Sequence, residues 1–390
     1  MKFIFIMLLL FKSALAQDAN LSLLDPALLA SKKNAYKNGN VQLVKQVQMV
    51  LKNADKFLSV NPESVMDKAL SPTSKSKHDY MSMAPYWWPD TTKADGLPYI
   101  RKDGVRNPII KKISDHEFLG NLEIRCKFLS LAYYFTGEEK YAAKAQQLLN
   151  VWFLNPATKM NPNLDYAQAI PGRNDGRGYG IIESRALVNI ADWVCLLDGA
   201  KSFSNSDKNG IKAWYKDYLN WMLTSKNGID ESKSKNNHGT HYDAQIASFS
   251  IFVGDYNLAK NILTTAKKRM VIQIDSDGKQ PLELERTNAY SYSTMNLDGW
   301  FNLAMVGDKI GVDLWNYQAE GLKKAINWLL PYALEEQPRT YKQLINYNSS
   351  EMYKLLMIAS AKYKGNYTEK SKLIPLSDKV ALTALLYQSK

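Results

Sequence analysis

Helical periodicity is the feature that most limits what this chain can fold into. Apolar residues return every three or four positions along much of its length, whereas the alternation typical of half-buried strands is scarce. The clearest stretches run from Val44 to Leu58, from Leu187 to Leu197, from Ile211 to Trp221 and from Leu322 to Leu329. The sequence therefore predicts an all-α protein.

Three short turns indicate how these helices are joined. A glycine followed by an acidic residue occurs at Gly137-Glu138, Gly254-Asp255 and Gly307-Asp308. Glycine suits the left-handed position at a helix end, and the acid favours the start of the next helix. Each turn therefore predicts a helical hairpin, and hairpins stacked side by side in a closed ring form an (α/α) toroid.

The first 16 residues read as a secretory signal peptide. Lys2 supplies a positive start, residues 3–11 are apolar, and the small residues from Ser13 to Ala16 suit a cleavage site. The apolar run is too short to span a membrane, and no other stretch is a candidate. We therefore expect cleavage near Ala16 and a secreted or periplasmic protein without a membrane span.

The rest of the chain, residues 17–390, is predicted to form a single domain. It is longer than a typical domain, but neither a Pro/Gly/Ser-rich linker nor a low-complexity segment divides it. The composition of the full sequence favours an anionic partner, because 50 Lys and Arg against 38 Asp and Glu give a formal net charge of +12. Nucleic acid is not expected, since the chain is predicted to be exported and shows no known nucleic-acid-binding module.

No metal site is predicted, and a disulfide is left open. Cys126 and Cys195 are the two cysteines, and they could pair in an oxidising compartment. His238 and His241 are three residues apart and could face one metal ion, but no HExxH pattern and no intervening carboxylate accompany them. We therefore expect the chain to work without a metal or another cofactor.

A polar loop that runs into a buried helix is the first candidate site. The stretch from Ser232 to Phe249 is polar at first and turns apolar at helical spacing in its second half. The loop carries Asn237 and His238. Thr240 followed by Asp243 predicts a helix cap at the junction, which would hold these side chains firmly. The alternative is an ordinary turn with a solvated histidine.

A second stretch supplies the residue types that the first one lacks. Arg286, Tyr290 and Tyr292 come just before another apolar helix. Asn, His, Arg and Tyr together suit β-elimination on a uronic acid, in which amide and cationic donors neutralise the carboxylate as a carbanion develops. A base then takes the C5 proton and an acid protonates the leaving glycosidic oxygen. Tyrosine can do either once a neighbouring cation lowers the pKa of its phenol.

These residues resemble the active site of the alginate lyase superfamily, meaning polysaccharide lyase families 5 and 38. An Asn-His pair and an Arg…Tyr pair form the active site of those families, and Asn237-His238 and Arg286 with Tyr292 match them. The resemblance covers most of the chain, roughly from residue 80 to past residue 300. It implies an (α/α) toroid, an incomplete barrel of helical hairpins, and chemistry without a metal.

The resemblance also implies a role for each catalytic residue. Asn237 and His238 would neutralise the substrate carboxylate, with Arg286 assisting and helping to lower the pKa of Tyr292. Tyr292 would act as the acid, and in a syn elimination also as the base, while His238 could be the base for the opposite C5 epimer. Tyr290 stays open as the alternative tyrosine, although two residues along a helix point roughly 200° apart.

Substrate-binding residues are expected in a long irregular segment, residues 78–108. Its many Pro, Gly and Asp residues disfavour regular structure, and loops of this length in a compact domain are usually functional. Aromatic side chains stack well on sugar rings. Those of this segment are Tyr80, Tyr86, Trp87 and Trp88. The alternative for the two tryptophans is that they fasten the loop to the core.

A glycine-rich stretch, residues 170–180, offers cationic contacts. Arg173 and Arg177 precede a helix predicted from Ile181, and arginines at a helix start suit a carboxylate. The alternative is a surface turn with solvated arginines. His241 and Tyr290 complete the set of expected substrate contacts.

The sequence therefore predicts a polysaccharide lyase that cleaves a polyuronate, most readily alginate, by β-elimination. A glucuronan lyase with the same chemistry and a non-catalytic polyuronate-binding protein are the alternatives. A glycoside hydrolase would need two placed carboxylates, and Glu283, Glu285 and Asp243 show no supporting pattern. The expected partner is an anionic polysaccharide, and the sequence does not predict an oligomeric state.

Overall fold

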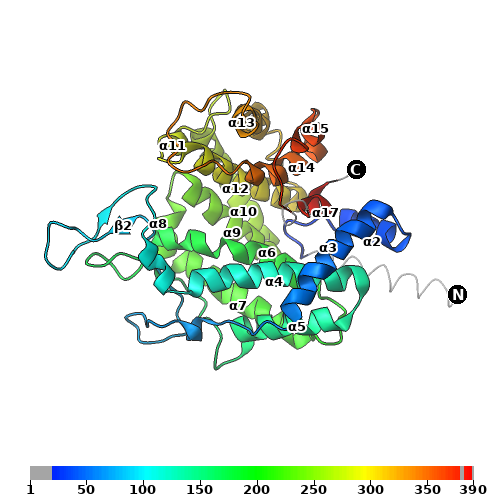
Figure 1. Cartoon of the computed structure of the whole chain (residues 1–390), viewed down its shortest axis with the longest axis horizontal. Helices are drawn as coiled ribbons and strands as arrows, with labels where there is room; N and C mark the ends of the chain where they lie inside the picture. Colours follow the sequence, from blue (N-terminus) through cyan, green and yellow to red (C-terminus); the bar gives the residue numbers. More distant parts are fainter. Residues whose placement is uncertain (1–19, 378–381, 389–390) are drawn as a thin grey trace.

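Helices dominate the computed structural model, which describes residues 20–377 and 382–388. Those that pack side by side at the centre are α4 (Asp115–Thr136), α6 (Ala186–Cys195), α9 (Asn237–Val253), α12 (Ala289–Ile310) and α14 (Met352–Lys362). Outer helices lie against them: α3 (Val41–Leu58), α5 (Glu139–Leu149), α7 (Asn205–Thr224), α10 (Tyr256–Gln273) and α13 (Tyr317–Ala333). Figure 1 shows this two-layered arrangement.

Shorter elements complete the ring and cover its ends. Between α14 and α4, α2 (Pro26–Lys37) packs against α17 (Thr383–Tyr387). The other short helices are α8 (Lys226–Ser232), α11 (Pro281–Leu284), α15 (Tyr367–Ser371), η1 (Val65–Asp67), η2 (Pro108–Lys112), η3 (Asn150–Leu154), η4 (Gly178–Arg185) and η5 (Ser349–Glu351). The predicted all-α class and the (α/α) toroid are confirmed.

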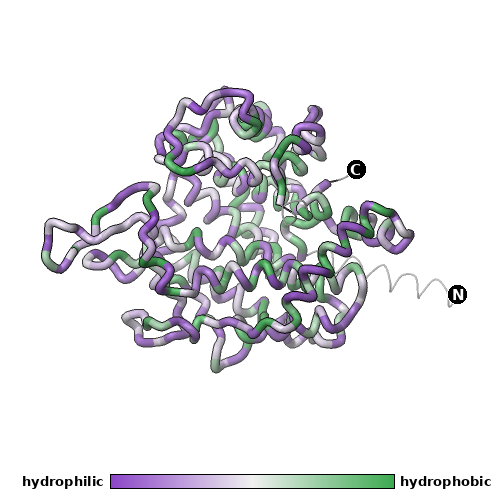
Figure 2. The backbone as a smooth tube through the Cα atoms, in the orientation of Figure 1, coloured by the Kyte–Doolittle hydropathy of each residue, from purple (hydrophilic) through white to green (hydrophobic). Residues whose placement is uncertain are grey.

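Burial explains why the inner helices form. Nearly every residue of α9 is buried, including its small polar residues, so this helix is enclosed on all sides. The outer helix α3 instead buries one stripe, with Val47, Val50 and Ala54 facing inward. Figure 2 shows hydrophobic segments gathered towards the middle of the molecule. One hydrophobic cluster runs through the whole ring, from the first described leucines to α17.

Two of the three predicted glycine turns are confirmed. Gly137 ends α4 and Gly254 ends α9, both in the left-handed conformation. The prediction at Gly307 is wrong, because α12 continues to Ile310 and the left-handed residue is Gly311. Gly307 has a packing role instead, since a Cβ there would collide with the backbone that follows the helix.

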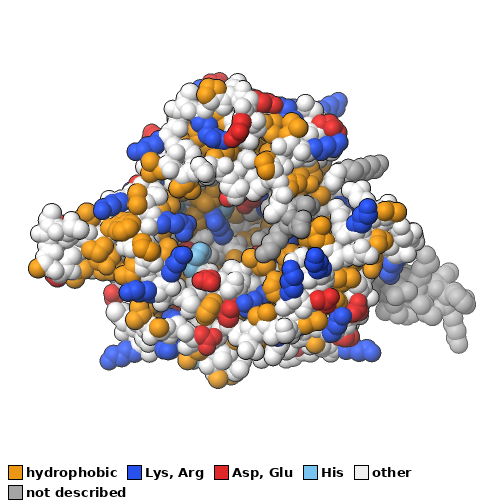
Figure 3. Space-filling view, in the orientation of Figure 1, with side chains coloured by type: hydrophobic (Ala, Val, Ile, Leu, Met, Phe, Trp, Pro, Cys, Tyr) orange, Lys and Arg blue, Asp and Glu red, His pale blue; other side chains and the backbone are white. Residues whose placement is uncertain are grey.

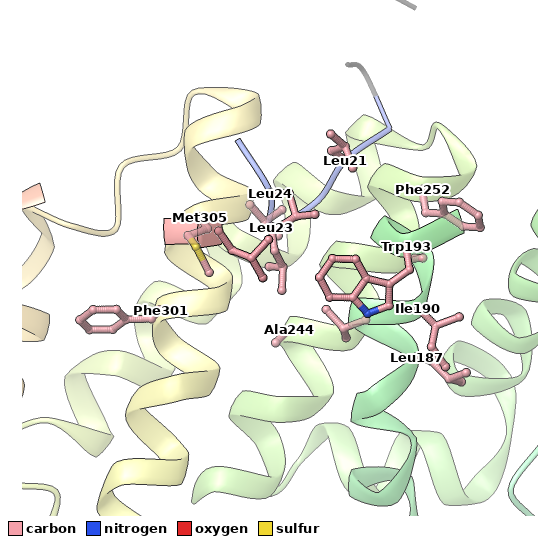
Figure 4. Close-up of a cluster of buried hydrophobic side chains, with 14 of the residues drawn as sticks. Leu21, Leu23, Leu24, Leu187, Ile190, Trp193, Ala244, Phe252, Phe301 and Met305 are labelled. Atoms are coloured by element: carbon pink, nitrogen blue, oxygen red, sulfur yellow. The ribbon is translucent and has the colours of Figure 1, made fainter. Parts of the chain in front are cut away.

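The first described residues close one end of the ring. Leu21, Leu23 and Leu24 are buried and lie among side chains of α6, α9 and α12 (Figure 4). Beside them the buried carboxylate of Asp192 accepts hydrogen bonds from the backbone N–H groups of residues 22–24 at 2.7–2.9 Å, and from the Ser22 hydroxyl at 3.0 Å. This segment, called the N-terminal plug below, therefore joins three inner helices.

Removing the anchor of the plug should cost much stability. Asp192→Ala leaves three backbone N–H groups and a hydroxyl buried without partners, and each such group costs about 1–3 kcal/mol. We expect the free energy of unfolding in urea to fall by at least about 3 kcal/mol. Asp198→Ala is the control, because Asp198 forms a partly exposed ion pair with Lys208, and such a pair contributes about 1 kcal/mol or less. Equal losses in the two variants would contradict the anchoring role.

Two small sheets lie in and beside the segment predicted to be irregular. The strand β1 (Met81–Met83) pairs in parallel with β4 (Tyr166–Ala169), and β2 (Trp87–Trp88) pairs antiparallel with β3 (Ile100–Arg101). The hairpin of β2 and β3 projects from the ring in Figure 1. The pairing of β1 with β4 therefore fastens the first part of residues 78–108 to the domain, and the β2–β3 hairpin extends away from it.

Three remaining expectations concern cysteines, export and membranes. Cys126 and Cys195 are both buried and free, so the disulfide left open by the sequence is not formed. The predicted signal peptide, residues 1–16, lies outside the described residues. Among the residues that the structure describes, no helix has both the length and the apolar character needed to cross a bilayer.

Candidate active site

A cleft of about 820 Å³ opens where α9 and α12 begin. Its other walls come from residues 82–117 and from η4. Figure 3 shows a hollow in this face, with lysine and arginine side chains and a histidine around it. The cationic side chains that line the cleft are Arg101, Arg106, Lys111, Arg177, Arg185, Lys235 and Arg286. Among the described residues its acidic lining is Glu117, Glu183 and Glu285, so the cleft carries a positive balance.

The start of α9 places Asn237 and His238. The helix begins at Asn237, and Asn236 caps it by accepting a hydrogen bond from the His238 backbone N–H at 3.3 Å. The predicted cap at Thr240 and Asp243 is wrong, because both residues lie inside the helix and have other partners. The predicted catalytic pair therefore lies in the first turn of a buried helix and not on a loop.

Asn237 is held by a buried acid that the sequence did not assign a role. Its backbone N–H donates to Glu283 Oε1 and its Nδ2 donates to Glu283 Oε2, each at 2.6 Å. Its own Oδ1 is buried and has no hydrogen-bond partner among the described residues, and Asn237 is one of the residues that line the cleft. Burial raises the pKa of Glu283 to about 7.

The state of Glu283 decides which end of the amide faces the substrate. When Glu283 is ionised, Nδ2 points to it and the cleft receives an oxygen, which repels a carboxylate. When Glu283 is protonated, the amide can turn over, so that Oδ1 accepts the carboxyl proton and the NH₂ group donates into the cleft. Only the second arrangement serves the predicted neutralisation of a uronate.

His238 forms a pair with a second buried acid. Its Nδ1 lies 2.6 Å from Glu231 Oε1, and Glu231 is only 1% exposed. A carboxylate in this position keeps the proton on Nδ1, so Nε2 is left as an acceptor. The ring also packs against Tyr179, with ring centroids 4.3 Å apart. His238 is therefore fixed in one tautomer and one orientation, as a general base requires.

Arg286 is held by Asp103, a residue of the long segment 78–108. Its Nη2 and Nε donate to the Asp103 carboxylate at 2.9 and 3.3 Å, and Thr287 donates to the same group at 2.9 Å. Although burial opposes it, Arg286 lowers the pKa of Asp103 to about 2. Because Asp103 takes two of its nitrogens, Arg286 is less free to bind a substrate carboxylate than the sequence predicted.

The same guanidinium lies over the ring of Tyr292, 4.0 Å from its centroid. The Tyr292 hydroxyl lies 2.8 Å from the hydroxyl of Tyr86 and donates to it. Burial raises the pKa of Tyr292 above its usual value, and the nearby Arg286 opposes this without cancelling it. The predicted net lowering of this pKa is therefore wrong, and Tyr292 rests in the protonated form that suits an acid.

The structure brings together seven of the twelve residues predicted for the site. They line the cleft: Tyr86, Trp87, Arg177, Asn237, His238, Arg286 and Tyr292. Arg173 lies beside it, in a smaller adjoining hollow. The helix predicted from Ile181 also differs, because η4 spans Gly178–Arg185 and α6 follows it.

Tyr80 and Trp88 do not reach the cleft. Tyr80 is fully buried, and its hydroxyl donates to Glu183 Oε2 at 2.9 Å, so it supports a residue of the cleft wall from behind. Trp88 donates from Nε1 to the Val105 carbonyl at 2.9 Å and lies under Lys102. It therefore holds residues 78–108 together internally, which is neither the predicted sugar contact nor the alternative of fastening the loop to the core.

His241 and Tyr290 are also enclosed. His241 lies one turn below His238, with Nε2 3.1 Å from the Met295 carbonyl. Tyr290 is fully buried against Trp328, and its hydroxyl accepts the backbone N–H groups of Thr340 and Tyr341 at 2.9 and 3.2 Å. Both predictions of substrate contact are wrong, because helical geometry turns these side chains into the core.

The buried imidazole of His241 should make the fold acid-sensitive. Burial, helped by the charge of Arg185, lowers the pKa of His241 to about 3, against about 6.5 in an unfolded chain. Below pH 6.5 His241 therefore takes up a proton in the unfolded state but not in the folded state, and the free energy of unfolding falls as pH falls. At pH 5 the loss from this group should be about 2 kcal/mol.

His241→Gln should remove this contribution. Urea unfolding of the variant and the wild type at pH 7 and pH 5 gives the comparison. We expect the wild type to lose about 2 kcal/mol more than the variant over this interval. The same pH dependence in both proteins would contradict a neutral buried His241.

The sequence did not predict the acids that hold the predicted catalytic residues. Neither Glu231 nor Asp103 was predicted to have a role. Glu283 was considered only as a possible catalytic carboxylate of a glycoside hydrolase. Tyr179, at 45% exposure, was also overlooked as an aromatic surface. A buried histidine or amide at a helix start needs a hydrogen-bond acceptor, but the sequence does not show which acidic residue is that acceptor. Among the described residues, no group of His, Cys, Asp and Glu is arranged to hold a metal ion.

Comparison with known proteins identifies the family of the chain. A family model described as alginate lyase matches residues 64–339. An alginate lyase from Bacteroides ovatus has 37% sequence identity with the chain, and its solved structure aligns with a TM-score of 0.88 over 95% of this chain and 99% of that one. Curated protein sequences give no match.

More distant structures share the fold. Alginate lyase A1-III from Sphingomonas species A1 aligns with a TM-score of 0.60 at 14% identity, over 95% of this chain and 96% of that one. A variant of A1-III complexed with a tetrasaccharide aligns over the same shares, with a TM-score of 0.62 at 14% identity. The family match covers most of the chain and includes all four predicted catalytic residues. This chain is therefore a polysaccharide lyase that belongs to the alginate lyase family.

Proposed function

We propose that this chain cleaves alginate by β-elimination, with Asn237, His238, Arg286 and Tyr292 around the reacting sugar. One observation carries the proposal. A base fixed by a buried carboxylate and a protonated phenol under a guanidinium line the same positively charged cleft. An anionic polymer is attracted to such a cleft, and both proton-transfer groups that the reaction needs are already there.

The proton transfers can be assigned to atoms. In an anti elimination, His238 Nε2 takes the C5 proton, the electron pair forms the C4–C5 double bond, and the C4–O bond breaks. The Tyr292 hydroxyl gives its proton to the leaving glycosidic oxygen. Glu231 stabilises the resulting imidazolium, and Asn237 binds the carboxylate on which charge develops.

In a syn elimination Tyr292 acts as both the base and the acid. The phenol must first lose its proton, take the C5 proton and then deliver it to the leaving oxygen on the same side of the sugar. Tyr86 is the hydrogen-bond acceptor of the Tyr292 hydroxyl, and it provides the first step of an exit path for that proton. Arg286, stacked on the ring, stabilises the phenolate that forms.

Ultraviolet absorbance during digestion tests the function directly. Elimination creates a conjugated unsaturated uronate, whereas hydrolysis does not. The enzyme should be incubated with alginate, polymannuronate, polyguluronate and glucuronan. We expect absorbance to rise fastest with alginate or one of its block polymers. A rise with glucuronan alone would identify a glucuronan lyase, and binding without any rise would identify a non-catalytic polyuronate-binding protein.

Electrostatic attraction should make polymer capture depend on salt. The charged residues that line the cleft are mainly Lys and Arg, and screening over about 8 Å at physiological ionic strength weakens long-range attraction. We expect KM for alginate to rise several-fold between low salt and about 0.5 M salt, whereas kcat changes little. A flat KM over this range would show that electrostatic attraction does not hold the polymer.

We also propose that the enzyme acts outside the cytoplasm, because the predicted signal peptide directs export. N-terminal sequencing of the protein after expression in its host would check this. The expected mature chain begins at Gln17, and a mature chain that still begins at Met1 would contradict export.

A further inference from the structure

A buried acid behind the cleft wall takes no part in the proton transfers assigned above. Glu283, in the short helix α11, is 1% exposed, and both of its carboxyl oxygens contact Asn237. They lie 2.6 Å from the backbone nitrogen of Asn237 and 2.6 Å from its Nδ2. Asn237 is itself buried and belongs to the cleft lining. A charge on Glu283 would therefore lie directly behind the residue that is proposed to bind the substrate carboxylate.

The groups that enclose Glu283 are mostly neutral. From α9 it meets the amide of Asn237. From α12, which packs against α11, the nearest printed contacts are those of Gln280, the residue before α11. Gln280 donates to the Ser293 carbonyl at 3.0 Å and accepts from Asn296 Nδ2 at 2.8 Å. Neither α9 nor α12 therefore supplies a charge at these contacts that would compensate an ionised Glu283.

The cation that acts on Glu283 is Arg286, three residues further along the chain. Its guanidinium is shared with Asp103, at 2.9 Å, so only part of its charge is available to Glu283. Lys235 and Glu285 also line the cleft, but both are exposed and water screens their charges. An ionised Glu283 is therefore poorly compensated in the empty site.

Burial consequently has the largest effect on this acid. It raises the pKa of Glu283 to about 7, although the hydrogen bonds from Asn237 and the charge of Arg286 oppose the shift. Near neutral pH the empty site is then a mixture of charged and neutral forms. A bound uronate adds a second carboxylate on the other side of Asn237, and like charges in a poorly hydrated site disfavour each other. Substrate should therefore favour the protonated form of Glu283.

The hydrogen-bonding capacity of Asn237 leads to the same conclusion. Its Oδ1 is buried and unpartnered within the described residues, so one polar atom of the empty site is unsatisfied. A protonated Glu283 can donate to this oxygen once the amide turns over, and the NH₂ group then takes its place at the cleft wall. A carboxylate accepts from an NH₂ group and is repelled by an oxygen. Substrate and proton therefore favour the same arrangement of the amide.

We propose that binding of the reacting uronate is coupled to the uptake of one proton from solvent by Glu283. Glu283 is then a positioning residue, which acts on the substrate through Asn237 and gives no proton to it. The inference rests on the proposed lyase function, because it assumes that a uronate carboxylate binds at Asn237. Below pH 7 Glu283 is already protonated, whereas above pH 7 binding must also protonate it, so affinity falls as pH rises.

Calorimetry counts the proton directly. Oligomannuronates or oligoguluronates that the wild type cleaves are titrated into Tyr292→Phe, in buffers of different ionisation enthalpy. The slope of the binding enthalpy against the buffer ionisation enthalpy gives the number of protons taken up per site. We expect about 0.9 protons at pH 8 and about 0.1 at pH 6, because these are the ionised fractions of a group that titrates near pH 7.

Glu283→Gln is the matched substitution. Glutamine accepts the Asn237 backbone N–H and donates to Oδ1, so it permanently imitates the protonated acid. In the Tyr292→Phe background it should abolish the proton uptake at pH 8. On its own it should leave KM for alginate within about twofold between pH 8 and pH 9, whereas KM of the wild type rises about tenfold. Glu369→Gln changes an exposed acid of α15, and this control should follow the wild type.

Three outcomes would overturn the coupling. They are an uptake near zero at pH 8, an uptake that persists unchanged in Glu283→Gln, and a folded Glu283→Gln that no longer binds the oligosaccharide. The first needs no substitution at position 283, so the test does not depend on the folding of that variant. Failure of the proposed function is recognisable separately, because the wild type would then produce no unsaturated uronate from any polymer.

Discussion

Tyr292→Phe should lower kcat by roughly two to four orders of magnitude while the protein folds normally. Phenylalanine keeps the ring under Arg286 but removes the proton that the leaving glycosidic oxygen needs, and a lost general acid has an effect of this scale. The polymer should bind about as well as before, because most cleft contacts remain. Initial rates of ultraviolet absorbance, together with KM and thermal unfolding, measure the three quantities.

Tyr290→Phe is the matched control. It removes the same atom two residues away, but Tyr290 is buried and its hydroxyl accepts two backbone N–H groups. We expect kcat within about tenfold of the wild type and a loss of stability of about 1–3 kcal/mol. The reverse ranking of the two variants, at temperatures where both are folded, would move the catalytic role to Tyr290.

His238→Ala should lower turnover by at least about a hundredfold. The variant removes Nε2 as the base and leaves the buried carboxylate of Glu231 facing an empty space. Because the anti elimination depends on His238 alone for proton abstraction, the loss should be largest on the polymer whose C5 proton lies on the side of this residue. Comparing kcat on polymannuronate and polyguluronate measures this difference.

His241→Gln is the control for this substitution. It changes another histidine on the same helix, one turn deeper and away from the cleft lining. Its kcat at pH 7 should remain within a few-fold of the wild type, since it touches no reacting atom. Near-normal turnover of folded His238→Ala on every polyuronate would remove His238 from the mechanism.

The fold was predictable because its signal is repeated many times along the chain. Helices such as α3 and α7 bury regular stripes, and each stripe repeats the same evidence of helical spacing. The residue types of the site were predictable for another reason: Asn, His, Arg and Tyr are the groups that elimination at a uronate requires. Asn237, His238, Arg286 and Tyr292 do line one cleft.

What the sequence could not show was the partner of each group. Glu283 meets Asn237 across 46 positions of the chain, and Asp103 meets Arg286 across 183. No local pattern records such pairs, because packing of distant segments creates them. The start of α9 was misplaced for a related reason. Its first polar residues, among them Asn237 and Thr240, look like a loop until their hydrogen-bond partners on other helices are known.

The N-terminal plug ties the completion of folding to the synthesis of the whole chain. Residues 21–24 are made early, yet Asp192 and the helices that enclose them follow about 170 residues later or more. Lys32 in α2 then donates to the carbonyl of Ala384 in α17, so the last helix that the structure describes contacts the first one. A nascent chain therefore cannot form this contact until α17 has left the ribosome. Removing even a few residues beyond position 20 would leave the buried carboxylate of Asp192 without its hydrogen-bond partners.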